Sequence, residues 1–228
     1  MESDRRISVA IDGPSGAGKS TLSRAAAQEL GFVYVDTGAI YRTVACYTLR
    51  RGADPRDEAA VERLLPEIEI AVEYDGEGLQ RMYLNGEDVT DRIRTQEVSM
   101  AASKVSAHPP VRAFLLNMQR EMARRHSSIM DGRDIGTVVL PQADVKIFLT
   151  ASSEARARRR WNDLRAQGTE KDFQQLLRET VERDERDMNR AAAPLRPAED
   201  AVTLDTTELS FEESRRKILE IIKERAGI

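Results

Sequence analysis

GPSGAGKS, residues 13–20, fits the glycine-rich P-loop pattern G-x-x-x-x-G-K-[S/T] at every fixed position. The largely apolar run 7–12 before it predicts a short buried strand. The alanine-rich stretch 21–30 after it predicts a helix that ends at Gly31. In this arrangement, successive backbone N–H groups and the positive end of the helix dipole can surround a phosphate chain. The alternative is a glycine turn that only joins a strand to a helix.

The P-loop reading predicts how a nucleoside triphosphate would be held. Lys19 would reach the β- and γ-phosphates, and the Ser20 hydroxyl would ligate Mg²⁺, with Asp36 or Asp131 acting on the metal through water. The residues expected around the ATP phosphates are Gly13, Pro14, Ser15, Gly16, Ala17, Gly18, Lys19, Ser20 and Thr21.

Length and composition restrict the class of protein. A chain of 228 residues can bury a sizeable core, and one domain with an insertion is the natural reading. A net charge of −4 argues against nucleic-acid binding, and two histidines with one cysteine argue against a closed zinc site. The lone Cys46 and the lack of a long apolar stretch predict a cytoplasmic protein with no membrane segment.

The order of apolar and amphipathic segments predicts an α/β fold. Short apolar runs alternate with helical stretches, which favours a P-loop NTPase-type parallel five-stranded sheet with helices on both faces. The expected strands lie near 7–12, 32–36, 127–131, 144–150 and 201–205. The last helix should begin with the capping box that starts at Ser210 and end at Gly227.

One segment breaks this alternation and predicts an antiparallel insert. Apolar residues at every second position over 68–74, a turn at 75–78 and a returning run at 79–84 indicate a hairpin. An antiparallel segment inserted into a parallel α/β chain suggests a small subdomain over the ligand face, at about 60–105. The remaining predicted parts of this single domain are a core of about 1–59, 106–151 and 190–228, and a helical lid of about 152–168.

Two motifs follow predicted strands at the carboxyl end of the sheet, where open α/β folds bind ligands. In DTGAIYR, residues 36–42, Thr37 and Arg42 could meet an anion; the alternative is an ordinary helix start. In DGRD, residues 131–134, a carboxylate could hold Mg²⁺ or its water shell and Arg133 could clamp phosphate. The alternative there is a turn of surface charges that pair with one another.

Two charged helices complete the set of candidate residues. Arg156, Arg159 and Arg160 share one face of a helix that could close over the nucleotide, although basic helices are commonly solvated surfaces. Arg183, Asp187 and Arg190 form one helical stripe that could bind a ribose and a phosphate. Surface ion pairs are the alternative for that stripe.

Together these segments resemble the bacterial branch of the cytidylate (CMP) kinase family over nearly the whole chain. The resemblance rests on IDGPSGAGKST (11–21), DTGAIYR (36–42), RTQEV (94–98), DGRDIGTV (131–138), VKIFL (145–149) and RDERDMNR (183–190). It implies transfer of the γ-phosphoryl group of ATP, with Mg²⁺ as cofactor, onto CMP or dCMP.

The resemblance also implies a role for each motif residue. Arg42 and Arg133 would hold the acceptor phosphate, with Thr37 beside it. Ser103, Arg112 and Asp134 would read the cytosine edge, although no tight motif surrounds the first two. Arg183 and Asp187 would hold the ribose. The residues implied at the transferring phosphoryl group are Arg156, Arg160 and Arg190, and the catalytic set is these three with Lys19, Arg133 and Asp134.

Two other functions remain open at this stage. The P-loop alone cannot choose the acceptor, so a kinase for UMP, AMP or a small metabolite is the first alternative. A GTPase-like switch is the second, since residues 75–78 have D-x-x-G spacing, but the chain contains no N-K-x-D motif. The expected partners are ATP and CMP or dCMP, and we expect a monomer.

Overall fold

The computed structural model describes residues 5–166 and 168–228. Residues 1–4 and 167, which fall within the expected core and lid ranges, lie outside the described residues. The chain forms two compact units, one made of 1–32 with 127–228 and the other of 33–126. No helix in the described part of the chain is both long enough and apolar enough to cross a bilayer.

Five parallel strands form the main sheet, as the sequence predicts, and the structure gives their order as β2-β6-β1-β7-β8. The strands are β1 (Ser8–Asp12), β2 (Val33–Asp36), β6 (Ser128–Gly132), β7 (Val145–Thr150) and β8 (Val202–Asp205). Strand β1 is central, and its apolar residues Val9, Ala10 and Ile11 are fully buried. An uninterrupted apolar run is the pattern of a parallel strand covered on both faces.

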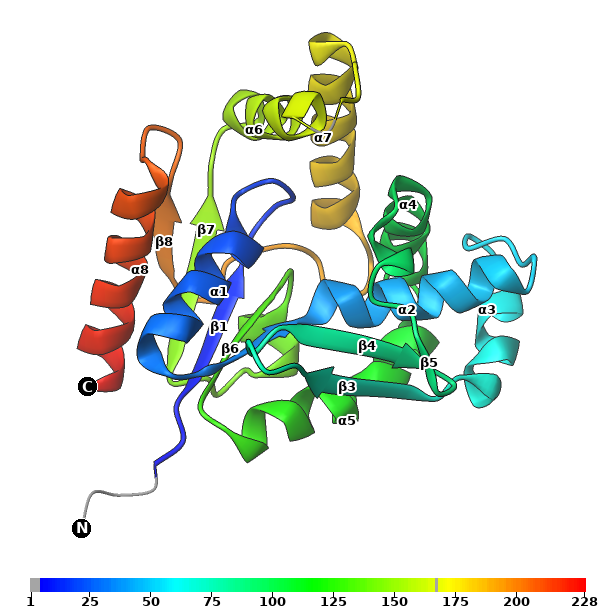
Figure 1. Ribbon diagram of the computed structural model, residues 1–228, viewed down its shortest axis with the longest axis horizontal. Coiled ribbons are helices and arrows are strands. Elements are labelled where there is room, and N and C mark those ends of the chain that lie inside the picture. Colours follow the sequence, from blue (N-terminus) through cyan, green and yellow to red (C-terminus); the bar gives the residue numbers. More distant parts are fainter. Residues whose placement is uncertain (1–4, 167) are drawn as a thin grey trace. The chain divides into compact units, whose positions relative to one another are not determined.

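Four helices and one short turn belong to the first unit. They are α1 (Lys19–Leu30), α6 (Ser153–Ala166), α7 (Phe173–Asn189), α8 (Phe211–Ala226) and the π-helical turn η3 (Ile135–Val139). Helix α1 packs against α8, as Figure 1 shows at the blue and red ends of the chain. The predicted helix ends are confirmed, because Ser210 and Glu213 form a capping box and Gly227 adopts a left-handed conformation.

Helix α6 lies within the expected lid of about 152–168 and packs against α7, which follows that range in the chain. Ser152 caps α6 by accepting a hydrogen bond from Ala155 N, and Asp172 caps α7 in the same way from Gln175 N. The Trp161 and Phe173 rings meet edge to face with their centroids 6.4 Å apart. This contact joins the second half of α6 to the start of α7.

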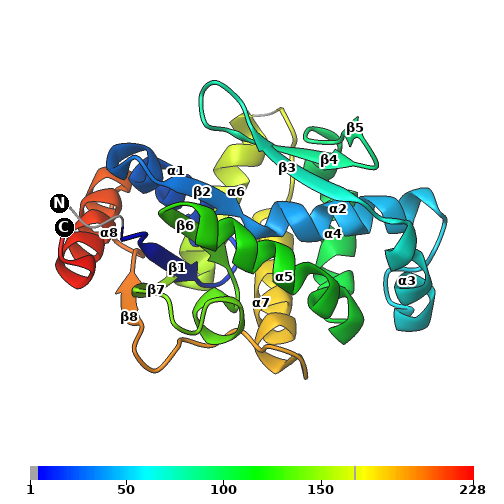
Figure 2. The same ribbon diagram turned by 90° about the horizontal axis from the view of Figure 1, so that it is seen from below.

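The second unit contains the predicted antiparallel insert. Strands β3 (Ile70–Tyr74), β4 (Gln80–Leu84) and β5 (Glu87–Asp88) form a separate three-stranded sheet. The Asp75 carboxylate accepts hydrogen bonds from Glu77 N and Leu79 N, which fixes the turn of the hairpin. The hairpin runs along α2 (Figure 2). The other elements are α2 (Thr37–Arg50), α3 (Glu58–Leu64), η1 (Leu65–Glu67), η2 (Arg92–Arg94), α4 (Gln96–Val105) and α5 (Pro109–Arg125).

An apolar core lies inside this second unit. Ile40 and Val44 of α2, Met82 and Leu84 of β4 and Leu115 of α5 all belong to it. Because α2 packs on both α4 and β4, the compact unit extends beyond the expected insert of 60–105 in both directions along the chain.

Candidate active site

The glycine turn after β1 has a backbone that only glycine can supply at its first position. Gly13 has φ +153°, and a Cβ atom there would lie 1.9 Å from the Leu149 carbonyl oxygen of β7. Gly18, at the N-cap of α1, has φ +90°. The close approach of the turn to β7 therefore excludes a side chain at Gly13.

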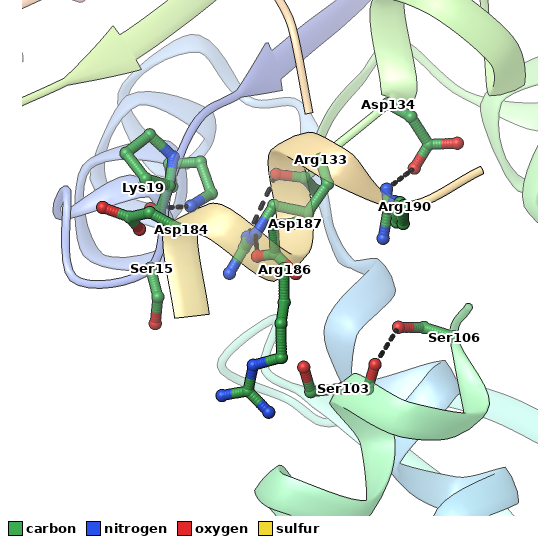
Figure 3. A network of polar contacts seen from close by, with 12 residues as sticks. Ser15, Lys19, Ser103, Ser106, Arg133, Asp134, Asp184, Arg186, Asp187 and Arg190 are labelled. Atoms are coloured by element: carbon green, nitrogen blue, oxygen red, sulfur yellow. Dashed lines mark hydrogen bonds and ion pairs between the residues drawn. The ribbon is translucent and has the colours of Figure 1, made fainter. Parts of the chain in front are cut away.

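Lys19 begins α1 and is almost completely buried. Its Nζ donates a hydrogen bond to the Pro14 carbonyl oxygen at 2.7 Å, within the glycine turn itself (Figure 3). Burial, and secondly the positive charge of Arg133, lower the pKa of Lys19 well below its usual value, while Asp131 and Asp12 oppose this. An anion bound in the turn would offset the same cost.

Ser20 and Asp131 place two oxygen atoms together beside the turn. The Ser20 hydroxyl donates to Asp131 Oδ2 at 2.8 Å. Hydroxyl and carboxylate oxygens suit Mg²⁺, which usually needs only one or two protein groups beside phosphate and water. No group of three or more His, Cys, Asp or Glu side chains arranged for a metal occurs among residues 5–166 and 168–228. The Ser20 and Asp131 oxygens fit a Mg²⁺ ion that also binds phosphate and water.

A second cluster of charges surrounds the end of β6. Arg133 Nε donates to Asp187 Oδ2 at 3.0 Å, and Arg190 Nη2 lies 3.6 Å from Asp134 Oδ1 (Figure 3). Burial raises the pKa of Asp187, but the charges of Arg133 and Arg183 outweigh it, so that the pKa lies below its usual value. The structure thus brings together four charged residues that the sequence placed in two separate motifs.

Arg183 of α7 has an unusual environment for an arginine. Among the described residues its Nε atom is buried with no hydrogen-bond partner. Burial, and secondly the charge of Arg133, lower its pKa to about 10, with a further lowering from Arg160. A buried donor without a partner costs free energy, and an oxygen-rich ligand would supply the missing acceptor.

The face of α6 expected to carry mobile arginines is tied to its surroundings. Arg156 is only 4% exposed and donates to both Asp184 carboxylate oxygens. It also donates to Ser15 O in the glycine turn at 2.9 Å. Arg159 donates to Ala17 O at 3.5 Å and to Thr206 O at 2.6 Å. Both guanidinium groups therefore contact the backbone of the phosphate loop in this structure.

Thr37 and Arg42 lie in the second unit at the start of α2. Asp36 caps the helix through Ala39 N, and its other oxygen accepts from Arg42 Nη2 at 2.8 Å. Gly38 leaves room for this guanidinium, since a Cβ there would lie 3.0 Å from Arg42 Nη1. The Arg42 Nε atom is buried with no hydrogen-bond partner in the described part of the chain. The structure thus shows the helix cap, and Arg42 pairs with the capping Asp36.

Ser103 and Arg112 also lie in the second unit, on α4 and α5. Arg112 Nη1 donates to Ser106 O at 3.0 Å, and its guanidinium lies over the Tyr41 ring, 5.7 Å from the centroid. Ser103 O accepts a hydrogen bond from Ser106 Oγ. Ser106 therefore contacts both of the residues that the resemblance assigns to the base.

Two carboxylates at the site were not identified from the sequence. Asp184 holds Arg156, and Asp12 accepts hydrogen bonds from Ile135 N and Gly136 N, both at 2.7 Å. Asp184 is next to Arg183 and one turn before Asp187 on α7, but the predicted stripe of Arg183, Asp187 and Arg190 does not include it. Asp12 directly precedes the P-loop and ends an apolar strand, which was a usable signal.

Comparison with known proteins gives a consistent result. The family model described as cytidylate kinase matches residues 9–224. The cytidylate kinase of Caldicellulosiruptor bescii is 49% identical over 217 residues, which cover 95% of this chain and 96% of the relative. The cytidylate kinase of Carboxydothermus hydrogenoformans is 50% identical, with coverage of 94% and 96%.

A solved structure resembles the fold. An uncharacterized protein from Eubacterium ventriosum matches with a TM-score of 0.50 and 13% identity, covering 96% of this chain and 99% of that chain. At this identity the likeness concerns the fold alone.

Proposed function

The chain belongs to the cytidylate kinase family and is a phosphotransferase that acts on CMP and dCMP, and we propose that the residues described above carry out this transfer. The observation that best supports the residue assignment is the burial of Lys19 and Arg183 beside Arg133, with both pKa values lowered. Cations held together at such a cost favour polyanionic ligands.

On the donor side, the glycine turn with its backbone N–H groups would bind the ATP phosphates, and Lys19 would leave Pro14 O to reach the β- and γ-phosphates. Ser20 would ligate Mg²⁺. Asp131 is the better supported of the two acidic helpers, because it already contacts Ser20. The Asp36 carboxylate is occupied by Ala39 N and Arg42. When bound, Mg²⁺ offsets the negative charge of the β- and γ-phosphates.

On the acceptor side, Arg42 and Arg133 would hold the CMP phosphate, with Thr37 beside it. The Arg42 Nε, which has no hydrogen-bond partner in residues 5–166 and 168–228, supports this role, since a phosphate oxygen would complete its hydrogen bonding. Arg183 and Asp187 would hold the ribose, which supplies both donors and acceptors. Ser103, Arg112 and Asp134 would read the cytosine edge.

The transfer step itself would depend on alignment and charge. A loose transition state leaves little covalent chemistry for the protein, so its task is to bring two anionic phosphates together without water. Arg156, Arg160 and Arg190 would stabilise the transferring group. Arg156 would have to leave at least one of its present acceptors, Asp184 or Ser15 O, in order to do so.

The cellular compartment and the oligomeric state are also part of the proposal. The single cysteine, Cys46, is buried and forms no disulfide, which suits a reducing cytoplasm. We propose that the enzyme works there as a monomer.

The test is a panel of acceptors combined with one substitution. ADP release would be measured with CMP, dCMP, UMP and AMP, and CMP and dCMP should be the preferred acceptors. Asp134→Ala should weaken CMP use and leave ATP affinity nearly unchanged. Unchanged steady-state constants for CMP in this variant would contradict the role given to Asp134.

A further inference from the structure

Asp12, the last residue of β1, is buried and connects two parts of the first unit. Its Oδ1 accepts a hydrogen bond from Ile135 N and its Oδ2 accepts one from Gly136 N, each at 2.7 Å. It directly precedes the P-loop glycine Gly13, while its two donors directly follow Asp134. One side chain therefore joins the phosphate loop to the residues after β6.

The two donated N–H groups belong to the first residues of η3. Such groups have no partner within a helix and are normally satisfied by the side chain of the residue before it, for which Asp is among the favoured types. Asp134 occupies that position but makes no capping hydrogen bond from its side chain. Its carboxylate instead lies 3.6 Å from Arg190 Nη2.

Asp12 therefore takes the role that Asp134 would ordinarily have. Burial, and secondly the charge of Asp134, raise the pKa of Asp12 to about 6, while the two hydrogen bonds and the nearby Lys19 oppose this. From β7, the side chain of Lys146 lies next to Gly136. Burying the Asp12 carboxylate costs free energy, and its two hydrogen bonds offset part of this cost.

We propose that Asp12 is a positioning residue that caps η3 from the neighbouring strand and so keeps the Asp134 carboxylate available for the CMP-binding site. The inference rests on the proposed role of Asp134 in substrate binding. If the external cap is weakened, Asp134 becomes the nearest group able to cap η3, and its carboxylate turns away from substrate.

The test begins with Asp12→Asn, which keeps the shape of the side chain but has a single acceptor oxygen. We expect kcat/KM for CMP to fall about tenfold or more, as for loss of one hydrogen bond to a charged group. The dissociation constant for ATP alone should change less than about threefold, because the glycine turn is retained. A uniform loss in both quantities would overturn the proposal.

Asp144→Asn is the matched control. The Asp144 carboxylate also binds a backbone amide of β1, accepting from Ser8 N at 2.9 Å, but at the opposite end of that strand. The Asp144→Asn substitution should lower thermal stability without lowering kcat/KM for CMP. If this control loses CMP use as Asp12→Asn does, general destabilisation explains both results and the proposal fails.

A double-mutant cycle separates this proposal from the proposed function. Because Asp12 acts through Asp134, Asp12→Asn should have little further effect in an Asp134→Ala background. If Asp134→Ala alone changes nothing, the substrate role of Asp134 is wrong. If Asp134→Ala impairs CMP use but Asp12→Asn does not, only the positioning role is wrong. Should Asp12→Asn fail to fold, Asp12→Ser replaces it, with the same expected and contradicting results.

Discussion

Two regions of the molecule carry many charged side chains, and these side chains differ in how far they are exposed to solvent. Around β5 and η2 of the second unit, the ion pairs are exposed: the Arg92 and Glu87 side chains are 65% and 45% accessible. Around the strand ends of the first unit they are buried: the Arg190 and Asp134 side chains are 8% and 6% accessible.

This difference in burial predicts which charged side chains bind a ligand. Exposed pairs cost little to form, add little stability and need no further partner. Buried charges are expensive unless fully compensated. Lys19 and Arg183 are not fully compensated, since burial, and secondly the charge of Arg133, lower the pKa of both. We therefore expect substitution of the buried charges to lower activity strongly, and substitution of the exposed charges to change activity and stability very little.

The largest effect should come from Lys19→Ala. Removing a cation placed at the phosphates typically costs about 2 to 4 kcal/mol of transition-state stabilisation. We expect a folded protein whose turnover falls by at least about a hundredfold. Near-normal turnover would refute the role of Lys19 in the P-loop.

Lys146 provides a matched control for this experiment. Like Lys19, it donates from Nζ to a proline carbonyl five residues earlier at 2.7 Å, in this case Pro141, but its other partner is Asp200. Lys146→Ala should reduce thermal stability and leave turnover within about threefold of the wild type. Equal losses of turnover in the two variants would mean that buried lysines matter here only for folding.

Arg183→Met should separate function from stability. It removes a guanidinium that Arg133 repels and whose buried Nε has no hydrogen-bond partner among the described residues. We therefore expect thermal stability to be unchanged or higher, while kcat/KM for CMP falls about thirtyfold or more. The control is Arg178→Met, an exposed position on the same helix, with no kinetic effect expected. A less stable Arg183→Met protein with normal kinetics would reverse the assignment.

The pH dependence of the free energy of unfolding should reveal the raised pKa of Asp12. Its pKa is raised from 3.8 to about 6 in the folded protein, so its contribution to stability is greatest below pH 4 and is lost as the pH rises through 6. The free energy of unfolding of the wild type, relative to Asp12→Asn, should fall by up to about 3 kcal/mol between pH 4 and pH 7. Denaturant titrations at both pH values measure this difference, and a pH-independent difference would contradict the raised pKa.

The smallest effect should come from Glu87→Gln in the second unit. Glu87 pairs with Arg50 and Arg92 at the surface. We expect the melting temperature to change by no more than about 2 °C, with a smaller change in high salt and unaltered kinetics. A large kinetic change would show that exposed charges also serve the reaction.

Much of the fold could be predicted because its signals are local. The strands β1, β2, β6, β7 and β8 follow from apolar runs, and the hairpin from a period of two. The extent of the second unit was not predictable in this way. It depends on the packing of α2 against α4 and β4, which are distant in sequence.

The site could be predicted where one motif carried its own chemistry, as at Lys19 and Ser20. Contacts between side chains of different motifs could not be predicted from the sequence. The sequence places Arg156 on a basic helix face, but its burial against Asp184 and Ser15 O appears only when three segments pack together. Asp12 as a cap for η3 likewise depends on the pairing of β1 with β6.

The most direct test of the account is a crystal structure of the protein with ADP and CMP bound. The buried Nε atoms of Arg42 and Arg183, which lack a hydrogen-bond partner among the described residues, should then donate to phosphate or ribose oxygens. Lys19 Nζ should have moved from Pro14 O to a phosphate. A structure with both nucleotides bound, in which these three groups keep their present surroundings, would contradict it.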